Sequence, residues 1–191
     1  MTSEQMVTIK NETFLVLPEY YGTIEKIIKR AKQEQINIIG GYSNSKETGV
    51  VLVDSSGLVI ARRTKARLVR AEQWNDIQVG TVSLFKYKDI TILPIICYEI
   101  VYPIDYYHFD EKIDLITHHI FSPMFDIYQY EGWRALEQAI SQHYNCPVVV
   151  ACGEDKRDYE LSIFNLTKTV LPTETGEFTN EKFDQYRRCG I

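Results

Sequence analysis

Long apolar runs, runs of basic residues and closely paired cysteines are all missing from this 191-residue chain. No segment approaches the roughly 18 consecutive apolar residues that suggest a membrane-spanning helix. The first ten residues contain neither the basic segment nor the apolar segment of a secretion signal. These absences lead us to expect a cytoplasmic protein with no membrane partner.

Cysteine is scarce, and no two of the four cysteines are separated by only two positions. A disulfide scaffold of this length would contain more of them, and zinc ribbons and thioredoxin-type sites need C-x-x-C pairs. We therefore expect reduced thiols at all four positions, which are Cys97, Cys146, Cys152 and Cys189.

The charge balance is weakly acidic, with 21 Lys and Arg residues against 26 Asp and Glu residues. The densest basic stretch, residues 62–70, is short, so no nucleic-acid partner is expected. Hydrophobic residues make up 45% of the chain, which is enough for a well-packed core. Because no repeat or linker interrupts the sequence, we expect one domain over residues 1–191, with residues 1–12 and 177–191 as flexible or interface tails.

Apolar runs of strand length alternate with helical patterns along the chain. Residues 13–17 predict a buried strand that ends at Pro18, and Thr23 is a suitable N-cap for a helix beginning at Ile24. A second helix is predicted for residues 131–144. Further strands are predicted at residues 36–42, 50–53, 58–60, 81–87, 90–96, 113–120 and 147–151, with a weak hairpin around Thr175 and Gly176. This mixture favours an α/β fold with mixed sheets.

Three residues with reactive side chains, Glu19, Lys65 and Cys97, each lie at the end of a predicted strand or just after one. Open α/β sheets often present functional groups at such places. A cysteine acts as a nucleophile when a nearby base or cation assists its ionisation. Each residue also has an ordinary interpretation, as a buried structural cysteine, a loop acid and a lysine in a solvated basic stretch.

The order and setting of these residues resemble the nitrilase, or carbon–nitrogen hydrolase, superfamily. The block around the cysteine is the most specific part of the resemblance, and the block around the glutamate is the least specific. The matching segments are L-P-E at 17–19, K-x-x-L at 65–68, I-I-C-Y-E-x-x-x-P at 95–103, W-x-x-L-x-x-A at 133–139 and P-V-V-V at 147–150.

The resemblance implies an αββα four-layer sandwich in which Glu19, Lys65 and Cys97 converge. It implies a thiol amidohydrolase that cleaves a non-peptide C–N bond of a small amide. In that reaction Glu19 is the base, Cys97 forms a thioester, and Lys65 with the Tyr98 backbone N–H stabilises the oxyanion. No metal and no organic cofactor are implied. Because family members usually associate through helices, a homodimer or larger homo-oligomer is expected.

The resemblance also suggests roles for residues around the substrate. Glu72 matches a second acid that positions substrate or assists proton transfer, although a plain surface acid is the alternative. Tyr98 directly follows the cysteine. His119, with His118, ends a predicted strand that lines the substrate pocket in the family; a structural role stays open, and the further ligands of a metal site are missing. Glu99 is expected to hydrogen-bond nearby backbone.

The sequence departs from the family pattern in three places. The chain is shorter than a typical member, so we expect an N-terminally shortened fold in which one sheet lacks an element. Pro94 lies inside the strand that leads to the cysteine, where proline is confined to edges or bulges. The second helix has Gln138, Ser141 and Gln142 where the family has Arg, Glu and Asn, which predicts the loss of a structural ion pair.

Three alternative functions stay open at this point. The acyl-enzyme could be passed to an amine, which would make the protein an acyltransferase, or the same three residues could hydrolyse a nitrile. A degenerate family member would bind a small metabolite or a protein partner without catalysis.

Overall fold

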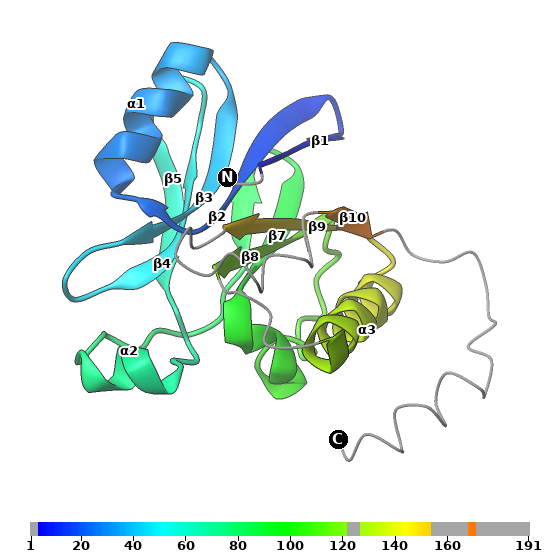
Figure 1. Ribbon diagram of the computed structural model, residues 1–191. Coiled ribbons are helices and arrows are strands. Elements are labelled where there is room, and N and C mark those ends of the chain that lie inside the picture. The colour runs from blue at the N-terminus through cyan, green and yellow to red at the C-terminus, as the bar shows by residue number, and fades with distance from the viewer. Residues whose placement is uncertain (1–3, 122–126, 154–167, 171–191) are drawn as a thin grey trace.

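Two five-stranded sheets face each other in the computed structural model, which describes residues 4–121, 127–153 and 168–170 (Figure 1). The first sheet has the order β1-β2-β3-β4-β5, with bounds Gln5–Ile9, Glu12–Gly22, Asn37–Ser43, Thr48–Val53 and Val59–Thr64. The second has the order β10-β9-β8-β7-β6, with bounds Lys168–Val170, Val148–Gly153, Leu115–Phe121, Ile90–Ile96 and Phe85–Tyr87. Parallel and antiparallel pairs occur in both sheets, so the predicted α/β class with mixed sheets is confirmed.

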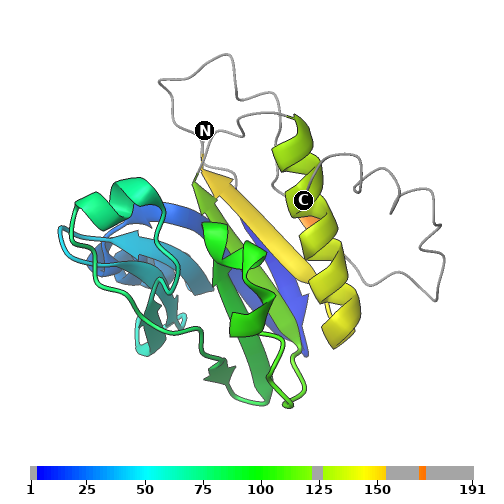
Figure 2. The same cartoon turned by 90° about the horizontal axis from the view of Figure 1, so that it is seen from below.

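Helices cover the outer faces of both sheets. Helix α1 packs on β3 and β4 of the first sheet, and α3 packs on β9 of the second, on the side away from the first sheet (Figure 2). The described helices are α1 (Ile24–Glu34), α2 (Arg70–Trp74) and α3 (Ile127–Tyr144), with 3₁₀ turns η1 (Cys97–Val101) and η2 (Pro103–Asp105). None of the helices in the described ranges is long and apolar enough to cross a membrane.

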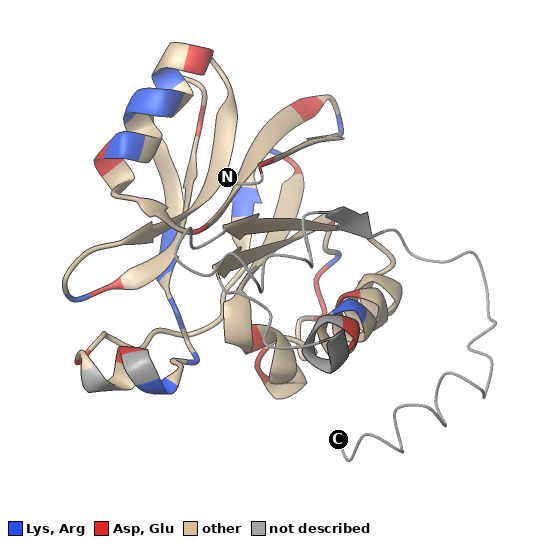
Figure 3. Ribbon diagram, viewed as in Figure 1, with Lys and Arg blue, Asp and Glu red and all other residues tan. Residues whose placement is uncertain are grey.

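Strand β2 illustrates how the sequence places the core. Phe14 and Val16 pack between the two sheets, while Leu15 and Leu17 pack against α1 on the opposite face. Successive side chains of a strand point to opposite faces, so a strand that is buried on both sides reads as a continuous apolar run. Charged residues instead gather on α1 and near strand ends, and the strands themselves are largely uncharged (Figure 3).

The structure corrects the predicted end of the first buried strand. Strand β2 does not stop at Pro18 but continues to Gly22, and its register against β3 shifts between Leu17 and Gly22. Pro18 lies within this irregularity, where the missing N–H of a proline breaks no regular ladder hydrogen bond. Glu19, one of the three candidate site residues, belongs to the same irregular stretch.

Two other strand predictions also need correction or explanation. The strand predicted at residues 81–87 is confined to Phe85–Tyr87, because only these residues pair with β7. Pro94 is accommodated inside β7 because β6 pairs with β7 only as far as Ile92. Beyond that residue no strand of the described ranges pairs with this edge of β7, so a proline breaks no pairing there.

The terminal segments are described in part. Residues 5–9, within the segment expected to be a tail, form β1 and pair with β2. Strand β10 pairs with β9, but the weak hairpin predicted around residues 175–176 and the expected tail at residues 177–191 lie outside the described residues. Helix α3 extends the prediction for residues 131–144 by four residues toward the N-terminus.

Candidate active site

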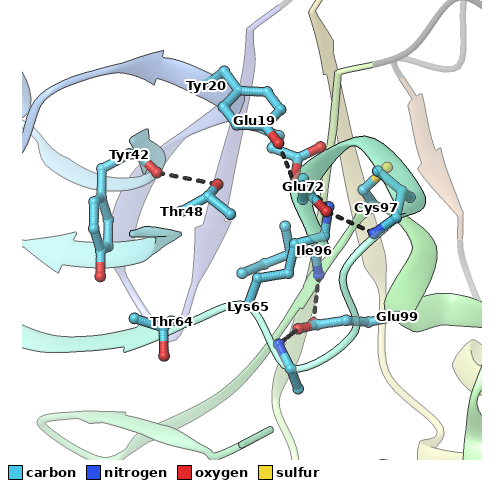
Figure 4. Close-up of polar contacts among 12 residues, drawn as sticks. Glu19, Tyr20, Tyr42, Thr48, Thr64, Lys65, Glu72, Ile96, Cys97 and Glu99 are labelled. Atoms are coloured by element: carbon cyan, nitrogen blue, oxygen red, sulfur yellow. Dashed lines mark hydrogen bonds and ion pairs between the residues drawn. The ribbon is translucent and has the colours of Figure 1, made fainter. Parts of the chain in front are cut away.

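Glu19, Lys65 and Cys97 come from three strands and meet between the two sheets. Lys65 Nζ lies 2.7 Å from Glu19 Oε1 and 2.8 Å from Glu72 Oε1 (Figure 4). Cys97 is close enough to Glu19 and Lys65 for these groups to shift its pKa. Glu19 and Lys65 keep 1% exposure, whereas Cys97 keeps 7%. All three residues of the cluster are therefore buried.

Lys65 is positioned by the backbone on both sides of it. Its N–H donates to Thr48 O at 2.8 Å, which extends the pairing of β4 and β5 by one residue. Its own carbonyl accepts from Gly80 N at 2.9 Å. The side chain is therefore delivered from a fixed backbone, which is how a long, flexible lysine keeps one location in a buried site.

Cys97 occupies a sharp turn at the end of β7. Its φ is +47°, in the left-handed region that L-residues other than Asn and Asp seldom adopt, and it begins the 3₁₀ turn η1. Nucleophilic residues of several hydrolases sit on such strained turns because the turn presents the side chain and leaves backbone N–H groups facing the substrate. Tyr98 follows in the same turn, with its side chain 37% exposed and its ring packed edge-on against Tyr102.

Glu99 fastens this turn to the strand that precedes Lys65. Its Oε2 accepts from Ile96 N at 2.8 Å and from Arg63 Nη2 at 2.5 Å. Its Oε1 accepts from Ala66 N at 2.6 Å and from Arg63 Nη1 at 2.9 Å. The carboxylate thus joins the backbone before Cys97 to the backbone after Lys65, in agreement with the structural role expected for Glu99.

Glu72 forms an ion pair with Lys65. Helix α2 places it so that Oε2 accepts from Val69 N at 2.8 Å, while Oε1 accepts from Lys65 Nζ and from the Tyr20 hydroxyl. Tyr20 itself has a positive φ of 54° in the irregular part of β2. These contacts hold the lysine ammonium between Glu72 and Glu19. The substrate-binding role suggested for Glu72 stays a prediction.

The ionisation states of the cluster are set by burial and by the three charges. Burial raises the pKa of Glu19 to about 7, and the nearby Lys65 ammonium limits this rise. Burial also raises the pKa of the Cys97 thiol well above its ordinary value, with Glu19 adding to the rise. For Lys65, burial alone would lower the pKa, but Glu19, Cys97 and Glu72 raise it overall. At neutral pH the resting site therefore holds a thiol, an ammonium and a partly ionised carboxyl.

One oxygen of Glu19 has no partner of its own. Among the described residues, Glu19 Oε2 accepts no hydrogen bond although it is buried. Buried carboxylate oxygens are normally satisfied, so an open one next to a thiol is an available proton acceptor. The three side chains together can therefore deprotonate a thiol and stabilise a developing oxyanion.

His119 is buried, and its ring bonds within the protein. Burial lowers the pKa of His119 to about 3, so the ring is neutral. Its Nδ1–H donates to Leu17 O at 2.6 Å, across the gap between the sheets, and Nε2 accepts from the Thr117 hydroxyl at 2.8 Å. These contacts tie the two sheets together, and the predicted contact of His119 with substrate stays a prediction.

Sequence reasoning did not assign individual roles to Tyr20, Arg63 and His118. The alternation of side chains along a strand could have pointed to Arg63, because Arg63 and Lys65 are two residues apart and so point to the same face. His118 and His119 are neighbours and point to opposite faces, one toward α3 and one toward the first sheet. No cluster of three or more His, Cys, Asp or Glu side chains suited to a metal ion occurs in the described part of the chain.

Solved structures with a similar fold include amidases and a carbon–nitrogen hydrolase. An amidase from Nesterenkonia sp. matches with a TM-score of 0.56 and 14% identity over 69% of this chain and 53% of its own. A carbon–nitrogen hydrolase from Helicobacter pylori G27 matches with a TM-score of 0.59 and 9% identity over 68% of this chain and 50% of its own. A Cys-to-Ser variant of the Nesterenkonia AN1 amidase, from the nitrilase superfamily, matches with a TM-score of 0.59 over 74% and 65%.

The sequence alone does not establish the relationship. No family model matches the chain, and no curated protein matches it either. Identities of 9–14% support a common fold and do not extend to activity. The chain also spans only about half to two thirds of the length of these proteins. The structural match therefore gives this chain the mixed α/β fold of nitrilase-superfamily amidases over part of their length.

Proposed function

We propose that this chain is a thiol hydrolase that cleaves the C–N bond of a small amide through a thioester on Cys97, within a shortened αββα sandwich of the carbon–nitrogen hydrolase type. The observation that carries the proposal is the meeting of a carboxyl, an ammonium and a thiol from three distant parts of the chain. Glu19 Oε2 accepts no hydrogen bond from the described residues, which leaves it available to take a proton. The match to amidase structures supports the same reaction class.

The first half of the reaction forms the thioester. Glu19 takes the proton of the Cys97 thiol, and the sulfur pair forms a bond to the amide carbonyl carbon. The C=O π pair moves to oxygen, where Lys65 and the Tyr98 backbone N–H stabilise the negative charge. As the C=O bond re-forms, the C–N bond breaks, and the proton held by Glu19 goes to the leaving amine.

The second half releases the acid. Glu19 takes a proton from water, and the oxygen of that water attacks the thioester carbon. When the tetrahedral intermediate collapses, the C–S bond breaks, the sulfur takes the proton back from Glu19, and the carboxylic acid departs. Glu72 serves this cycle by holding the lysine ammonium in place, since its oxygens accept from Lys65, Tyr20 and Val69 N.

Short aliphatic amides are the substrates to try first. A variant of the Nesterenkonia amidase binds butyramide, and acrylamide adds to the active-site cysteine of another variant. Wild-type protein incubated with butyramide and quenched in acid is expected to show an intact mass increased by the butyryl group, lost in Cys97→Ala. Cys146→Ala is the matched control, because Cys146 is also buried but lies at the turn between α3 and β9.

Three results decide between the functions. Turnover that persists in Cys97→Ala would refute the proposal. Product acid that carries the label from heavy-oxygen water supports hydrolysis, whereas unlabelled product formed with an added amine indicates acyl transfer. If Cys97 reacts with acrylamide no faster than Cys146 and no amide is turned over, the chain is a binding protein without catalysis.

A further inference from the structure

A buried histidine connects the Cys97 turn to helix α3. His118 Nε2 lies 3.0 Å from Cys97 O, and Nδ1 lies 2.8 Å from Glu137 Oε1. His118 and Glu137 are both completely buried. Through His118, Glu137 is thus connected to the backbone of Cys97, the proposed nucleophile. Neither of the two His118 contacts involves Glu19 or Lys65.

The chemistry of the two contacts fixes where the protons are. A carbonyl oxygen can only accept, so Nε2 of His118 carries a hydrogen that it donates to Cys97 O. On the other side Nδ1 faces a carboxylate oxygen, which is also an acceptor unless Glu137 is protonated. The proton between Nδ1 and Oε1 is therefore shared within the pair, and the ring cannot turn over without losing both contacts.

Glu137, the residue that His118 contacts on α3, is itself held by a further contact. Arg134 Nη1 lies 2.6 Å from Glu137 Oε2, one helical turn away on α3. The ring of Trp133 lies 5.5 Å from the His118 ring, centroid to centroid, and limits its movement. Helix α3 thus contains an ion pair between Arg134 and Glu137. The loss of a pair expected from Gln138, Ser141 and Gln142 stays a prediction.

The target of the contact is a strained part of the backbone. Cys97 has a φ of +47° and is the first residue of the 3₁₀ turn η1, in which Tyr98 follows it. A residue in this conformation is held there by its surroundings. Glu99 fixes the N–H of Ile96 before the turn, and His118 fixes the carbonyl within it. A hydrogen bond to that carbonyl sets which way the peptide after Cys97, and hence the Tyr98 N–H, points.

We propose that His118 is a positioning residue, which holds the Cys97 carbonyl against helix α3 and so keeps the thiol and the Tyr98 N–H aligned for attack. The effect of His118 on catalysis rests on the proposed function. Its effect on the thiol does not, because the alignment of the thiol toward Glu19 governs the reaction of Cys97 with any electrophile. His118 touches no reacting atom and acts only through the backbone of Cys97.

Two substitutions test the contacts of the two ring nitrogens separately. In His118→Gln the side-chain amide nitrogen falls near the Nε2 position and can still donate to Cys97 O. In His118→Asn it falls near the Nδ1 position and can reach only Glu137. Ser141→Ala is the matched control, because it also removes a buried hydrogen bond from a side chain to a backbone carbonyl, in this case from Ser141 on α3 to Cys146 O at 2.8 Å.

The measurements are the rate of acrylamide addition to Cys97 by intact mass, kcat and KM on butyramide, and the thermal midpoint. We expect the Asn variant to lose about tenfold in the addition rate and in kcat with KM little changed, and the Gln variant to stay within about threefold of wild type. Ser141→Ala should lower the midpoint and leave the addition rate unchanged. Equal addition rates in the Asn and Gln variants, or losses that follow the midpoint in all three, would overturn the proposal.

A measurement on the wild-type protein covers the case in which the variants do not fold. The ¹⁵N shift of His118 Nε2 is expected to be that of a protonated nitrogen at neutral pH, and an unprotonated Nε2 refutes the contact outright. The acrylamide arm also separates this proposal from the proposed function. If wild type turns over no amide but the Asn variant still loses acrylamide reactivity relative to Gln, the function fails and the positioning role stands.

Discussion

Two buried carboxylates on either side of the Lys65 strand end, Glu99 and Glu19, have almost the same exposure and opposite surroundings. Glu99 accepts four hydrogen bonds, two from Arg63 and two from backbone N–H groups. Glu19 accepts one, from Lys65, and its other oxygen has no partner among the described residues. The number of donors, and not burial, distinguishes the structural carboxylate Glu99 from Glu19, the proposed base.

The difference has a simple physical basis. A carboxylate that already accepts a hydrogen bond at every acceptor position has no free lone pair to bind a proton. Its hydrogen bonds instead hold the backbone segments that it joins in place. A carboxylate that is buried and under-satisfied has a raised pKa, as Glu19 has at about 7, and can take and return a proton near neutral pH. Four predictions test this comparison.

Glu19→Gln should have the largest effect. The amide keeps the shape and a contact to Lys65 but cannot accept the thiol proton, so kcat should fall by roughly 10²- to 10⁴-fold. The far-ultraviolet circular dichroism spectrum and the thermal midpoint should show that the fold is kept. A variant that retains more than a tenth of the wild-type kcat would place the base elsewhere.

Glu99→Gln should act on stability. Arg63 would keep its charge in a buried place without a counter-charge, and one or more backbone N–H groups would face an amide NH₂. We expect the free energy of unfolding in urea to fall by about 3–5 kcal/mol. The control is Glu111→Gln, which breaks an exposed ion pair with Lys86 and should leave the unfolding curve nearly unchanged. Equal effects of the two changes would contradict the structural role of Glu99.

The pH dependence follows from the raised pKa of Glu19. The base works only when ionised, so kcat/KM should fall about tenfold per pH unit below a limb near pH 7 and level off above it. Folding favours the protonated carboxyl, because its pKa is raised from 4.5 to about 7. Stability from this group is therefore present below pH 4.5 and is lost as pH rises toward 7.

Glu19→Gln supplies the control for the stability measurement. Urea unfolding at several pH values should show a slope between pH 4.5 and 7 in wild type that is smaller in the variant, since the variant lacks the titrating group. Identical slopes would mean that Glu19 titrates at its ordinary value, and the comparison with Glu99 would then lose its electrostatic basis.

Tyr20→Phe should have the smallest effect. It removes one of three donors from Glu72 and keeps the edge-on contact of the ring with Phe121. Lys65 would be held less firmly, and we expect kcat to fall about three- to tenfold, in line with about 1 kcal/mol for one hydrogen bond. Kinetics on butyramide measure it, and an unchanged kcat would show that the lysine is held in place without the Tyr20 contact to Glu72.

The sequence predicted the elements better than their ends. The buried strands and both long helices follow from apolar patterns, but the extension of β2 beyond Pro18 does not, because a proline usually ends such a pattern. The extension is decided by the register shift against β3, which depends on a strand that comes later in the chain. Glu19 owes its place in the site to that shift.

Within the candidate site, the sequence placed Cys97 at the end of a strand. It did not identify the residues that hold the Cys97 turn in place. Arg63 reads as part of a surface basic stretch, yet it is buried and pairs with Glu99. His118 reads as one of two equivalent histidines, yet only it contacts the Cys97 carbonyl. Such roles depend on residues far apart in the chain, which local patterns do not encode.

The amino-acid sequence by itself determined most of the buried strands, their burial on both faces and the presence of a carboxyl, an ammonium and a thiol near the ends of three of them. Only the tertiary structure decided which buried carboxylate is saturated with donors and which keeps an open oxygen beside the thiol. The physical reason is that periodicity and propensity act within a few residues, whereas the number of hydrogen-bond donors around a buried oxygen is fixed by how two sheets meet.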